Sequence, residues 1–419
     1  MTARKVLCII PNTFQRGPAA AWKAHMQNHH VIVAGAGPVG LTAALLLARA
    51  GLRVTLLEKR ATLNQASKAS TFHAPTLAVL DHLGVLQAMR EQGLQVDHIQ
   101  YRTTELGIIG EIALRELEAV TDYPFRLHLE QSRVTPMLLA QLQALPNAQV
   151  CFETGLVDAR NVPGGVVVTV QDAAGTRDIA ADYLLGTDGA HSQVRQAAGI
   201  AFDAQPYPGA VLRVLTDESL DRLIPGLRPI SYLVNGAASA SFLRMPDCWR
   251  IILRVPAEVA LERAQTSGWV LGRLRQLVPD LAGLPNILGM DVYSASRYAA
   301  PAFRNGRIYL AGDATHLSNT RGGMNMNCGI HDAYAIAGAM VRAFRENDQT
   351  LLDAAADARR DVATQQLLPR TDAMVSAQVS WLENVQRILA DPQERLAFLR
   401  RTAMLDMAPE LARRLPATL

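Results

Sequence analysis

The order of apolar and polar positions near residue 30 predicts a β-α-β unit. The mainly apolar segment His30–Ala34 is typical of a buried parallel strand, and Pro38–Ala50 is typical of a helix that Gly51 closes. A second strand is predicted at Arg53–Glu58. Units of this kind build parallel sheets covered by helices, so this part of the chain predicts an α/β fold.

The pattern changes further along the chain. Short alternating segments within residues 97–129, and again within 201–296, predict a mostly antiparallel sheet. The segment Ile179–Leu185 predicts a single strand. The apolar segment Arg307–Ala311 predicts a strand that returns to the parallel sheet.

These patterns predict an α/β protein, and a length of 419 residues suggests two or three domains. A Rossmann-like domain with a parallel sheet is interleaved with a mostly antiparallel α+β domain, and a helical C-terminal tail follows a long helix at Asn327–Arg345. The predicted division is an N-terminal extension at 1–29, the Rossmann-like domain at 30–98, 125–200 and 297–345, the α+β domain at 99–124 and 201–296, and C-terminal helices at 346–419.

Composition narrows the class of protein. Hydrophobic residues make up 49% of the chain and charged residues 19%, which argues against disorder. The net charge of +3 is small for this length, so no nucleic-acid partner is expected. The four cysteines are scattered and form no Cys-x-x-Cys pair, so no metal site is predicted. Because so few cysteines do not form a disulfide scaffold, a reducing compartment, the cytoplasm, is the expected location.

Two segments bear on membranes and targeting. Residues 31–52 carry one charge, Arg49, but their glycines argue against a membrane span, so no membrane partner is expected. Residues 1–29 contain no Asp or Glu, and a lack of acidic residues is typical of transit peptides. Met26, however, lies just before the first strand and could itself be the start of translation. The segment is either a targeting sequence or an extension upstream of the working start, and the sequence leaves both open.

A glycine-rich turn joins the first strand to the helix. Gly35, Gly37 and Gly40 have the G-x-G-x-x-G spacing, in which one glycine permits the turn, one lets backbone approach a pyrophosphate and one permits close helix packing. The helix N-terminus offers unpaired amides to the phosphates. Glu58 ends the second strand and can accept hydrogen bonds from both ribose hydroxyls. Because it would repel a 2′-phosphate, it favours FAD or NAD over NADP at this site.

Two further motifs follow apolar strands. The segment Gly186–Gly189, with Asp188, is by itself typical of an ordinary turn. In Gly312–His316 the carboxylate of the Asp follows a strand end and can accept a hydrogen bond from a ribityl hydroxyl. The run Gly322–Asn327 then opens the long helix, where backbone amides can meet a flavin edge.

Together these motifs resemble those of the class A flavoprotein monooxygenases, the p-hydroxybenzoate hydroxylase family, over about residues 30–345. The segments 68–73, 124–133 and 298–307 also resemble family segments. The resemblance implies that the Rossmann-like domain binds FAD and that the other domain binds a small aromatic substrate. NADH or NADPH would reduce FAD, O2 would form a flavin C4a-hydroperoxide, and one oxygen atom would pass to the ring. A homodimer is a possible assembly, and the chain resembles the short members of the family.

The resemblance also implies roles for individual residues. The three glycines would hold the pyrophosphate and Glu58 the adenosine ribose. Asp188 would belong to a motif shared by FAD and NAD(P)H, and Asp313 would contact the ribityl chain. The implied cofactor-binding residues are Gly35, Gly37, Gly40, Glu58, Lys68, Gln131, Asp188, Gly312, Asp313, Gly323, Met324, Asn325 and Met326.

The chain departs from the family pattern beside the predicted flavin site. Asn319 and Thr320 stand where the family usually has prolines, and Asn325 stands where it usually has a glycine. The predicted contacts to the ribose, the pyrophosphate and the ribityl chain remain, so the prediction of FAD is unaffected. The departures instead leave the details of the oxygen chemistry, and therefore the substrate, undetermined by the resemblance.

Substrate contacts are less sharply defined by the sequence. Polar candidates are Arg213, Tyr232, Arg244, Tyr293 and His316, and each residue type also has an ordinary structural role. Of these, His316, Tyr232 and Arg213 are predicted as catalytic residues.

Three alternatives to aromatic hydroxylation stay open, and a fourth is disfavoured. An oxygenase that opens an N-heteroaromatic ring, or an epoxidase, would keep the same fold. A non-catalytic FAD-binding protein is a further alternative. A flavin halogenase is disfavoured because the segment that begins at Trp249 lacks the second Trp and the Pro of the halogenase motif.

Overall fold

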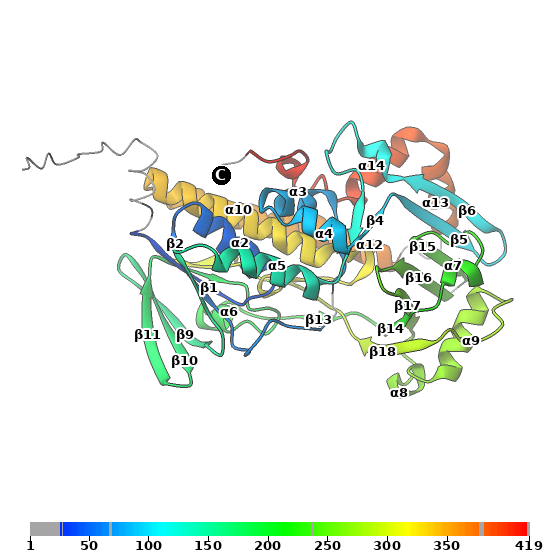
Figure 1. The fold of residues 1–419 in the computed structure, drawn as a ribbon, viewed down its shortest axis with the longest axis horizontal. Helices are drawn as coiled ribbons and strands as arrows, with labels where there is room; N and C mark the ends of the chain where they lie inside the picture. Colours follow the sequence, from blue (N-terminus) through cyan, green and yellow to red (C-terminus); the bar gives the residue numbers. More distant parts are fainter. Residues whose placement is uncertain (1–25, 27, 67–68, 237, 377–380, 417–419) are drawn as a thin grey trace, which may run out of the picture.

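The computed structural model describes residues 26, 28–66, 69–236, 238–376 and 381–416, and it contains two main sheets (Figure 1). The first sheet has the strand order β20-β21-β12-β1-β2-β8. All its neighbouring strands run parallel except the edge pair β20–β21. Its strands are β1 (His30–Ala34), β2 (Arg53–Leu57), β8 (Ala148–Cys151), β12 (Tyr183–Gly186), β20 (Arg304–Asn305) and β21 (Ile308–Leu310).

Alternate residues of β1 enter two different cores, as the period of a strand requires. Val31 and Val33 pack with α2 (Pro38–Arg49) and α10 (Met324–Glu346). Ile32 and Ala34 pack with the opposite layer, which is formed by α6 (Gln193–Ala197) and a three-stranded antiparallel sheet. That sheet consists of β9 (Gly155–Val162), β10 (Gly165–Asp172) and β11 (Gly175–Ala181).

The helix α2 is buried from Pro38 to Ala48, because it packs between α10 and α5 (Gln131–Gln143). This explains why its sequence is almost uncharged without being a membrane span. None of the described helices combines the length and apolarity needed to cross a bilayer.

The second main sheet has seven strands in the order β18-β14-β17-β16-β15-β5-β6. Neighbours are antiparallel except β15 and β5, which are parallel. One face packs on α9 (Ser267–Leu277) around a separate apolar core, and the other face points away from that core. The strands are β5 (His98–Thr103), β6 (Gly107–Ala113), β14 (Ala210–Thr216), β15 (Ile230–Asn235), β16 (Ala238–Arg244), β17 (Trp249–Val255) and β18 (Ile287–Tyr293).

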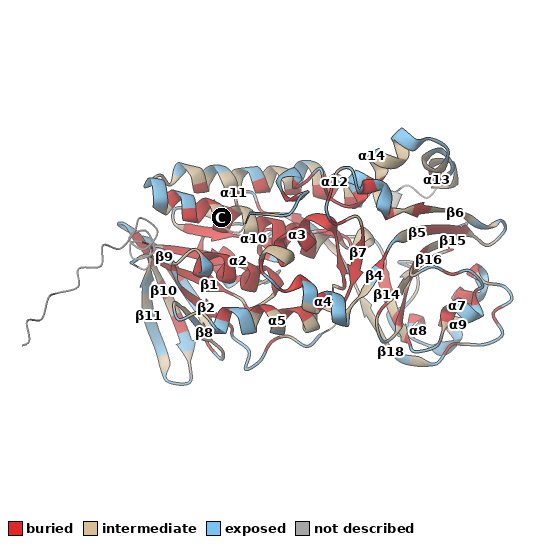
Figure 2. Ribbon diagram, turned by 45° about the horizontal axis from the view of Figure 1, so that its top comes forward, coloured by how far each residue is buried: buried red, intermediate tan, exposed pale blue. Residues whose placement is uncertain are grey.

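Short elements and C-terminal helices connect the two sheets (Figure 2). Helix α11 (Thr350–Val362) packs along α10, and α13 (Trp381–Ala390) packs against β6. The remaining strands are β3 (Thr71–Phe72), β4 (Leu94–Val96), β7 (Arg126–His128), β13 (Gln205–Pro206), β19 (Ser296–Ala299) and β22 (His316–Leu317). The remaining α-helices are α3 (Ala74–His82), α4 (Leu86–Gln92), α7 (Leu220–Leu223), α8 (Leu261–Ala264), α11 (Thr350–Val362), α12 (Leu368–Ser376), α13 (Trp381–Ala390) and α14 (Pro392–Thr402).

Two predicted elements differ in detail from the structure. The single strand predicted at Ile179–Leu185 is divided at Asp182, because β11 pairs with β10 whereas β12 pairs with β1 in the parallel sheet. At the break, the Asp182 carboxylate accepts the backbone N–H of His30 at 2.7 Å. The long helix begins at Met324 rather than Asn327, since Gly323 forms its N-cap with a φ of 63°. The domain boundaries given above stay a prediction.

Candidate active site

A large cleft lies between the parallel sheet and the outward face of the seven-stranded sheet. Its volume is about 1710 Å³, larger than the 300–1,000 Å³ typical of a pocket for one small ligand. Glu58, Asp188 and Asp313 all line it, although they come from three different strand ends. The cleft is therefore large enough to hold a dinucleotide and a second, smaller molecule.

The glycine turn after β1 shapes the wall of this cleft. Gly35 has a φ of 102°, and a Cβ there would lie 2.6 Å from the carbonyl oxygen of Thr187. A Cβ on Gly40 would lie 1.9 Å from the Gly35 oxygen, so this glycine lets helix and turn touch. At Gly37 a Cβ would meet nothing within 4 Å, although the residue lines the cleft. The N-terminus of α2 thus borders open space without a side-chain cap, which suits a pyrophosphate.

Glu58 is held in one orientation at the end of β2. Its side chain is buried, with Oε2 accepting the backbone N–H of Ala36 and Oε1 that of Arg60, both at 3.0 Å. Oε1 also lies 3.5 Å from the guanidinium of Arg60, whereas Oε2 keeps a second lone pair with which the carboxylate can accept a ribose hydroxyl.

Asp188 lines the cleft but directs its oxygens to its own turn. Oδ1 accepts the Ser192 hydroxyl at 2.5 Å, and Oδ2 accepts the backbone N–H of Gln193 at 2.7 Å. Burial raises the pKa of Asp188 above its usual value, although these hydrogen bonds oppose the rise. The carboxylate therefore fixes the start of α6, and a cofactor contact from it stays a prediction.

The far part of the cleft is bordered by Asp313 and the start of α10. Asp313 is exposed, and its Oδ1 accepts a hydrogen bond from Nδ2 of Asn325 at 2.8 Å. Gly322 and Gly323 have φ values of 77° and 63°, which turn the backbone into the helix. Gly312 does not line the cleft. It packs closely against Gly329 of α10, since a Cβ on Gly329 would lie only 2.9 Å from the Cα of Gly312.

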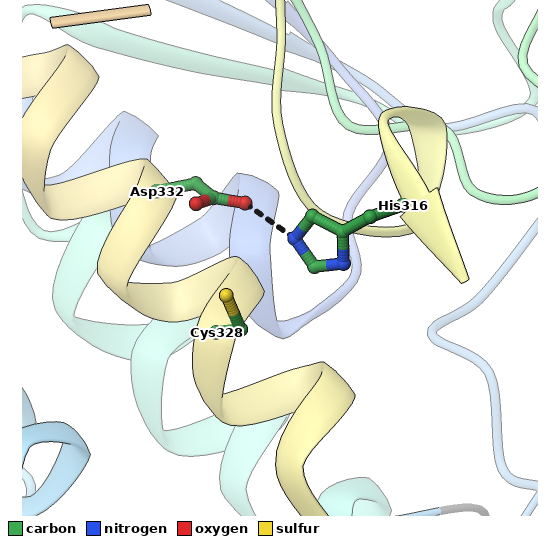
Figure 3. A group of neighbouring side chains, drawn as sticks. All are labelled: His316, Cys328 and Asp332. Carbon is green, nitrogen blue, oxygen red and sulfur yellow. Dashed lines mark hydrogen bonds and ion pairs between the residues drawn. The ribbon is translucent and has the colours of Figure 1, made fainter. Parts of the chain in front are cut away.

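His316 belongs to a buried ionic group behind the cleft (Figure 3). It is fully buried, and its Nε2 lies 2.8 Å from Oδ2 of Asp332. The guanidinium of Arg359 donates to Asp332 at 2.7 Å and to the sulfur of Cys328 at 3.3 Å. His316, Cys328 and Asp332 are metal-ligating residue types, but a guanidinium already supplies the positive charge among them.

The charges in this group support one another. Burial alone would raise the pKa of Asp332, but Arg359 and His316 hold it below its usual range. Burial alone would lower the pKa of His316, but Cys328 and Asp332 raise it well above the ordinary value. The other ring nitrogen, Nδ1, lies 3.0 Å from Oδ1 of Asn325. His316 thus reaches the cleft through Asn325, and a direct catalytic role for it stays a prediction.

The structure brings most of the other predicted residues to the cleft. Arg213 and Tyr232 line it from the seven-stranded sheet, and Gln131 lines it from the start of α5. Met324 and Met326 line it from α10. Lys68 lies outside the described residues.

Sequence reasoning missed several residues that line the cleft beside the seven-stranded sheet. Arg250 and Arg254 project from β17 on the side opposite its buried apolar residues, and strand alternation could have indicated them. Tyr101 and Trp381 also line the cleft, from β5 and α13. No local pattern links Trp381 to this site, because it is contributed by a distant helix.

Comparisons with known proteins identify the family. The family described as FAD binding domain matches residues 28–368. The chain belongs to this family. Its fold class, its FAD cofactor and its membership among the class A flavoprotein monooxygenases are confirmed.

Named relatives are monooxygenases. The chain is 28% identical to para-nitrophenol 4-monooxygenase of a Pseudomonas species, over 87% of this chain and 89% of the relative. It is 28% identical to 6-hydroxy-3-succinoylpyridine 3-monooxygenase of Pseudomonas putida, over 80% and 85%. A solved p-nitrophenol 4-monooxygenase from Pseudomonas putida has a TM-score of 0.76 and 26% identity, covering 91% of this chain and 94% of that one. The prediction of an FAD-dependent aromatic monooxygenase is confirmed.

Proposed function

We propose that this flavoprotein uses NADH or NADPH and O2 to hydroxylate a small phenol-type ring at the seven-stranded-sheet end of the cleft. The observation that carries the proposal is the continuity of one cleft from Glu58, past Asp313, to the sheet face that bears Tyr232. The named relatives act on a nitrophenol and on a hydroxypyridine, which supports a hydroxylated ring as substrate.

The residues fit FAD at the parallel-sheet end. Gly37 leaves room for a pyrophosphate at the α2 N-terminus, and Glu58 would accept the ribose hydroxyls. Asp313 would hold the ribityl chain, and the amides that begin α10 would bind the pyrimidine edge of the ring. FAD, when bound, supplies hydride acceptance and oxygen activation, while the protein orients the substrate and excludes water.

An aromatic wall borders the substrate end. Tyr101 stacks on Tyr232 with ring centroids 5.8 Å apart, and Trp381 meets Tyr101 edge-on at 6.0 Å. Phe398 also contacts Tyr101 and lines the cleft. Offset and edge-on contacts of this kind suit a planar ring as an additional partner.

Oxygen transfer is tested with purified holoenzyme. We expect a yellow flavin spectrum, NAD(P)H oxidation accelerated by a phenol, and a product that carries one atom from labelled O2. Two labelled atoms in the product would instead establish a ring-opening oxygenase. A flavoprotein whose NAD(P)H oxidation no aromatic compound accelerates would overturn the proposal.

We further propose a cytoplasmic protein, because Cys151, Cys248 and Cys328, the cysteines within the described residues, are free thiols. A homodimer stays a prediction that light scattering of the purified protein would test.

A further inference from the structure

The turn that leads into α10 is built on two glycines at the wall of the cleft. Gly322 and Gly323 both line the cleft, and their φ values of 77° and 63° lie in the left-handed region. Glycine gives a backbone no stiffness of its own. Neither Asn319 nor Thr320, which precede the turn, restricts the backbone as a proline would. The shape of the turn must therefore be fixed by contacts with other parts of the chain.

Helix α12 holds the residues just before the turn. Nδ2 of Asn319 donates to the backbone carbonyl of Thr371 at 2.5 Å, and its Oδ1 accepts the backbone N–H of Arg321 at 2.9 Å. The guanidinium of Arg321 donates to the backbone carbonyl of Met374. These bonds end at residue 321, so the two glycines that follow depend on a different contact.

His73, which directly follows β3, holds the glycine turn. Its Nε2 lies 2.8 Å from the carbonyl oxygen of Gly322, and because a carbonyl can only accept, Nε2 carries the hydrogen. The backbone N–H of His73 donates to Oδ1 of Asn327 at 3.0 Å, and Nδ2 of Asn327 donates to the carbonyl of Gly323 at 2.7 Å. The carbonyls of both glycines are thus tied to residue 73, one directly and the other through a single side chain.

The imidazole of His73 is a neutral donor in a fixed place. The residue is fully buried, and burial, followed by the charge of Arg126, holds its pKa well below the ordinary value. The other ring nitrogen, Nδ1, is buried without a hydrogen-bond partner among the described residues. Burying an unpaired polar atom costs free energy, which a leucine of similar size would avoid. The bond to Gly322 is therefore what a histidine contributes at this position.

The glycine turn sets where α10 begins. Gly323 is the N-cap of this helix and gives its first turn no side-chain hydrogen bond, while Met324 and Asn325 line the cleft directly after it. The unpaired amides and the partial positive charge of a helix N-terminus favour negative charge in front of them. FAD gains negative charge when it is reduced, so a helix start that is held in place favours the reduced form.

We propose that His73 is a positioning residue for the flavin. By holding the carbonyl of Gly322, it keeps the amides that begin α10 in place for the pyrimidine edge of the ring, and so favours reduced over oxidised FAD. His73 does not line the cleft, so it acts through the turn and not by contact with the cofactor. The inference rests on the proposed function, since it concerns the place where that function puts the flavin.

Two substitutions separate the hydrogen bond from the packing of the ring. His73→Leu removes the donor and keeps the apolar bulk, whereas His73→Gln offers an amide N–H at about the reach of Nε2. The midpoint potential of bound FAD is measured on the holoenzyme by reductive titration against a reference dye. We expect His73→Leu to weaken the binding of reduced relative to oxidised FAD about tenfold, which lowers a two-electron midpoint by about 30 mV. His73→Gln should recover most of that loss.

His128 on β7 provides the matched control. It is also fully buried, its Nδ1 lies 2.7 Å from the backbone carbonyl of Arg244, and its Nε2 has no hydrogen-bond partner within the described part of the chain. His128→Leu therefore removes the same kind of bond from a carbonyl that does not belong to the glycine turn. We expect it to destabilise the apoprotein in urea about as much as His73→Leu does, and to leave the midpoint potential of bound FAD unchanged.

Three results would overturn the inference: an unchanged midpoint in His73→Leu, an equal shift in His128→Leu, or no recovery in His73→Gln. Circular dichroism and flavin content show that each variant is folded. If His73→Leu does not fold, His73→Asn, whose shorter side chain does not reach the carbonyl of Gly322, is expected to lower the midpoint in its place. The potential is measured without substrate, so failure of the proposed function is a separate result, namely that no aromatic compound accelerates NAD(P)H oxidation.

Discussion

At the scale of single residues, the glycines of the first turn separate packing from binding. Gly40 is required because any side chain would strike the backbone of Gly35, whereas Gly37 faces open cleft. The sequence predicted both positions from their spacing. It could not show which glycine is needed for packing and which leaves room for a ligand, because that depends on which atoms surround each glycine in the folded protein.

Substitution of these two glycines should therefore have different effects. We expect Gly37→Val to leave the unfolding midpoint of the apoprotein nearly unchanged but to weaken FAD binding by tenfold or more, because the side chain fills the phosphate space. Gly40→Ala should destabilise the apoprotein by about 1–3 kcal/mol or more, the usual cost of overpacking. Urea unfolding measures the stability of each apoprotein, and flavin titration measures its affinity for FAD. An equal loss of stability in the two variants would contradict the separate roles of Gly37 and Gly40.

Asn325 provides a second prediction at this scale. It accepts a hydrogen bond from His316 and donates one to Asp313, so it holds the carboxylate that faces the predicted ribityl site. We expect Asn325→Ala to raise the FAD dissociation constant by roughly fivefold to tenfold, about the net value of one ordinary hydrogen bond. Asn325→Asp should weaken binding further by placing two carboxylates together. Unchanged FAD affinity in both variants would show that Asn325 has no positioning role.

At the scale of elements, the buried ionic group joins α10 to α11. Asp332 comes from α10 and Arg359 from α11, while His316 follows the Asp313 turn. The sequence predicted both helices as helices, and the Gly312–His316 motif as a cofactor loop. It did not predict this group, because the three charged residues are distant in sequence and share no motif spacing.

Removing the central carboxylate should destabilise these elements. Asp332→Asn leaves Arg359 buried without its counter-charge, so we expect a loss of about 3–5 kcal/mol in the free energy of unfolding. Urea unfolding measures it, and Asp353→Asn, which removes a partly exposed carboxylate on α11, is the control with a smaller loss. A loss as small as that of the control would mean that the group contributes little.

The same group predicts a dependence of stability on pH. The pKa of His316 is raised in the folded protein, so its contribution is complete below the unfolded value of about 6.5 and declines as pH rises toward the folded pKa. Asp332 acts in the opposite direction, because its lowered pKa adds stability that is lost only in strong acid. Between pH 7 and 9 we therefore expect His316→Asn to flatten the decline in unfolding free energy. An unchanged slope would contradict the raised pKa.

At the scale of the whole molecule, the cleft depends on parts of the chain that are far apart. The parallel sheet lines the half that we propose for the cofactor, the seven-stranded sheet lines the half that we propose for the substrate, and α13 and α14 add Trp381 and Phe398. The first half was predictable because its motifs sit beside strand ends. The C-terminal helices were predicted as helices, but their place beside the cleft was not, since amphipathic helices do not encode which surface they cover.

Trp381 should consequently affect the coupling of NAD(P)H oxidation to product formation more than it affects FAD binding. Because it packs on Tyr101 at the border of the cleft, Trp381→Ala opens that wall to water while leaving Glu58 and the glycine turn intact. We expect a severalfold higher KM for the aromatic substrate, unchanged FAD content, and a larger share of NAD(P)H consumed to form hydrogen peroxide instead of product. Trp269→Ala, on α9 beyond the opposite face of the seven-stranded sheet, is the matched control and should keep the coupling ratio. If both tryptophan variants uncoupled to the same extent, the loss would reflect general loosening of the substrate sheet rather than opening of the cleft, and the C-terminal helices would have no part in excluding water.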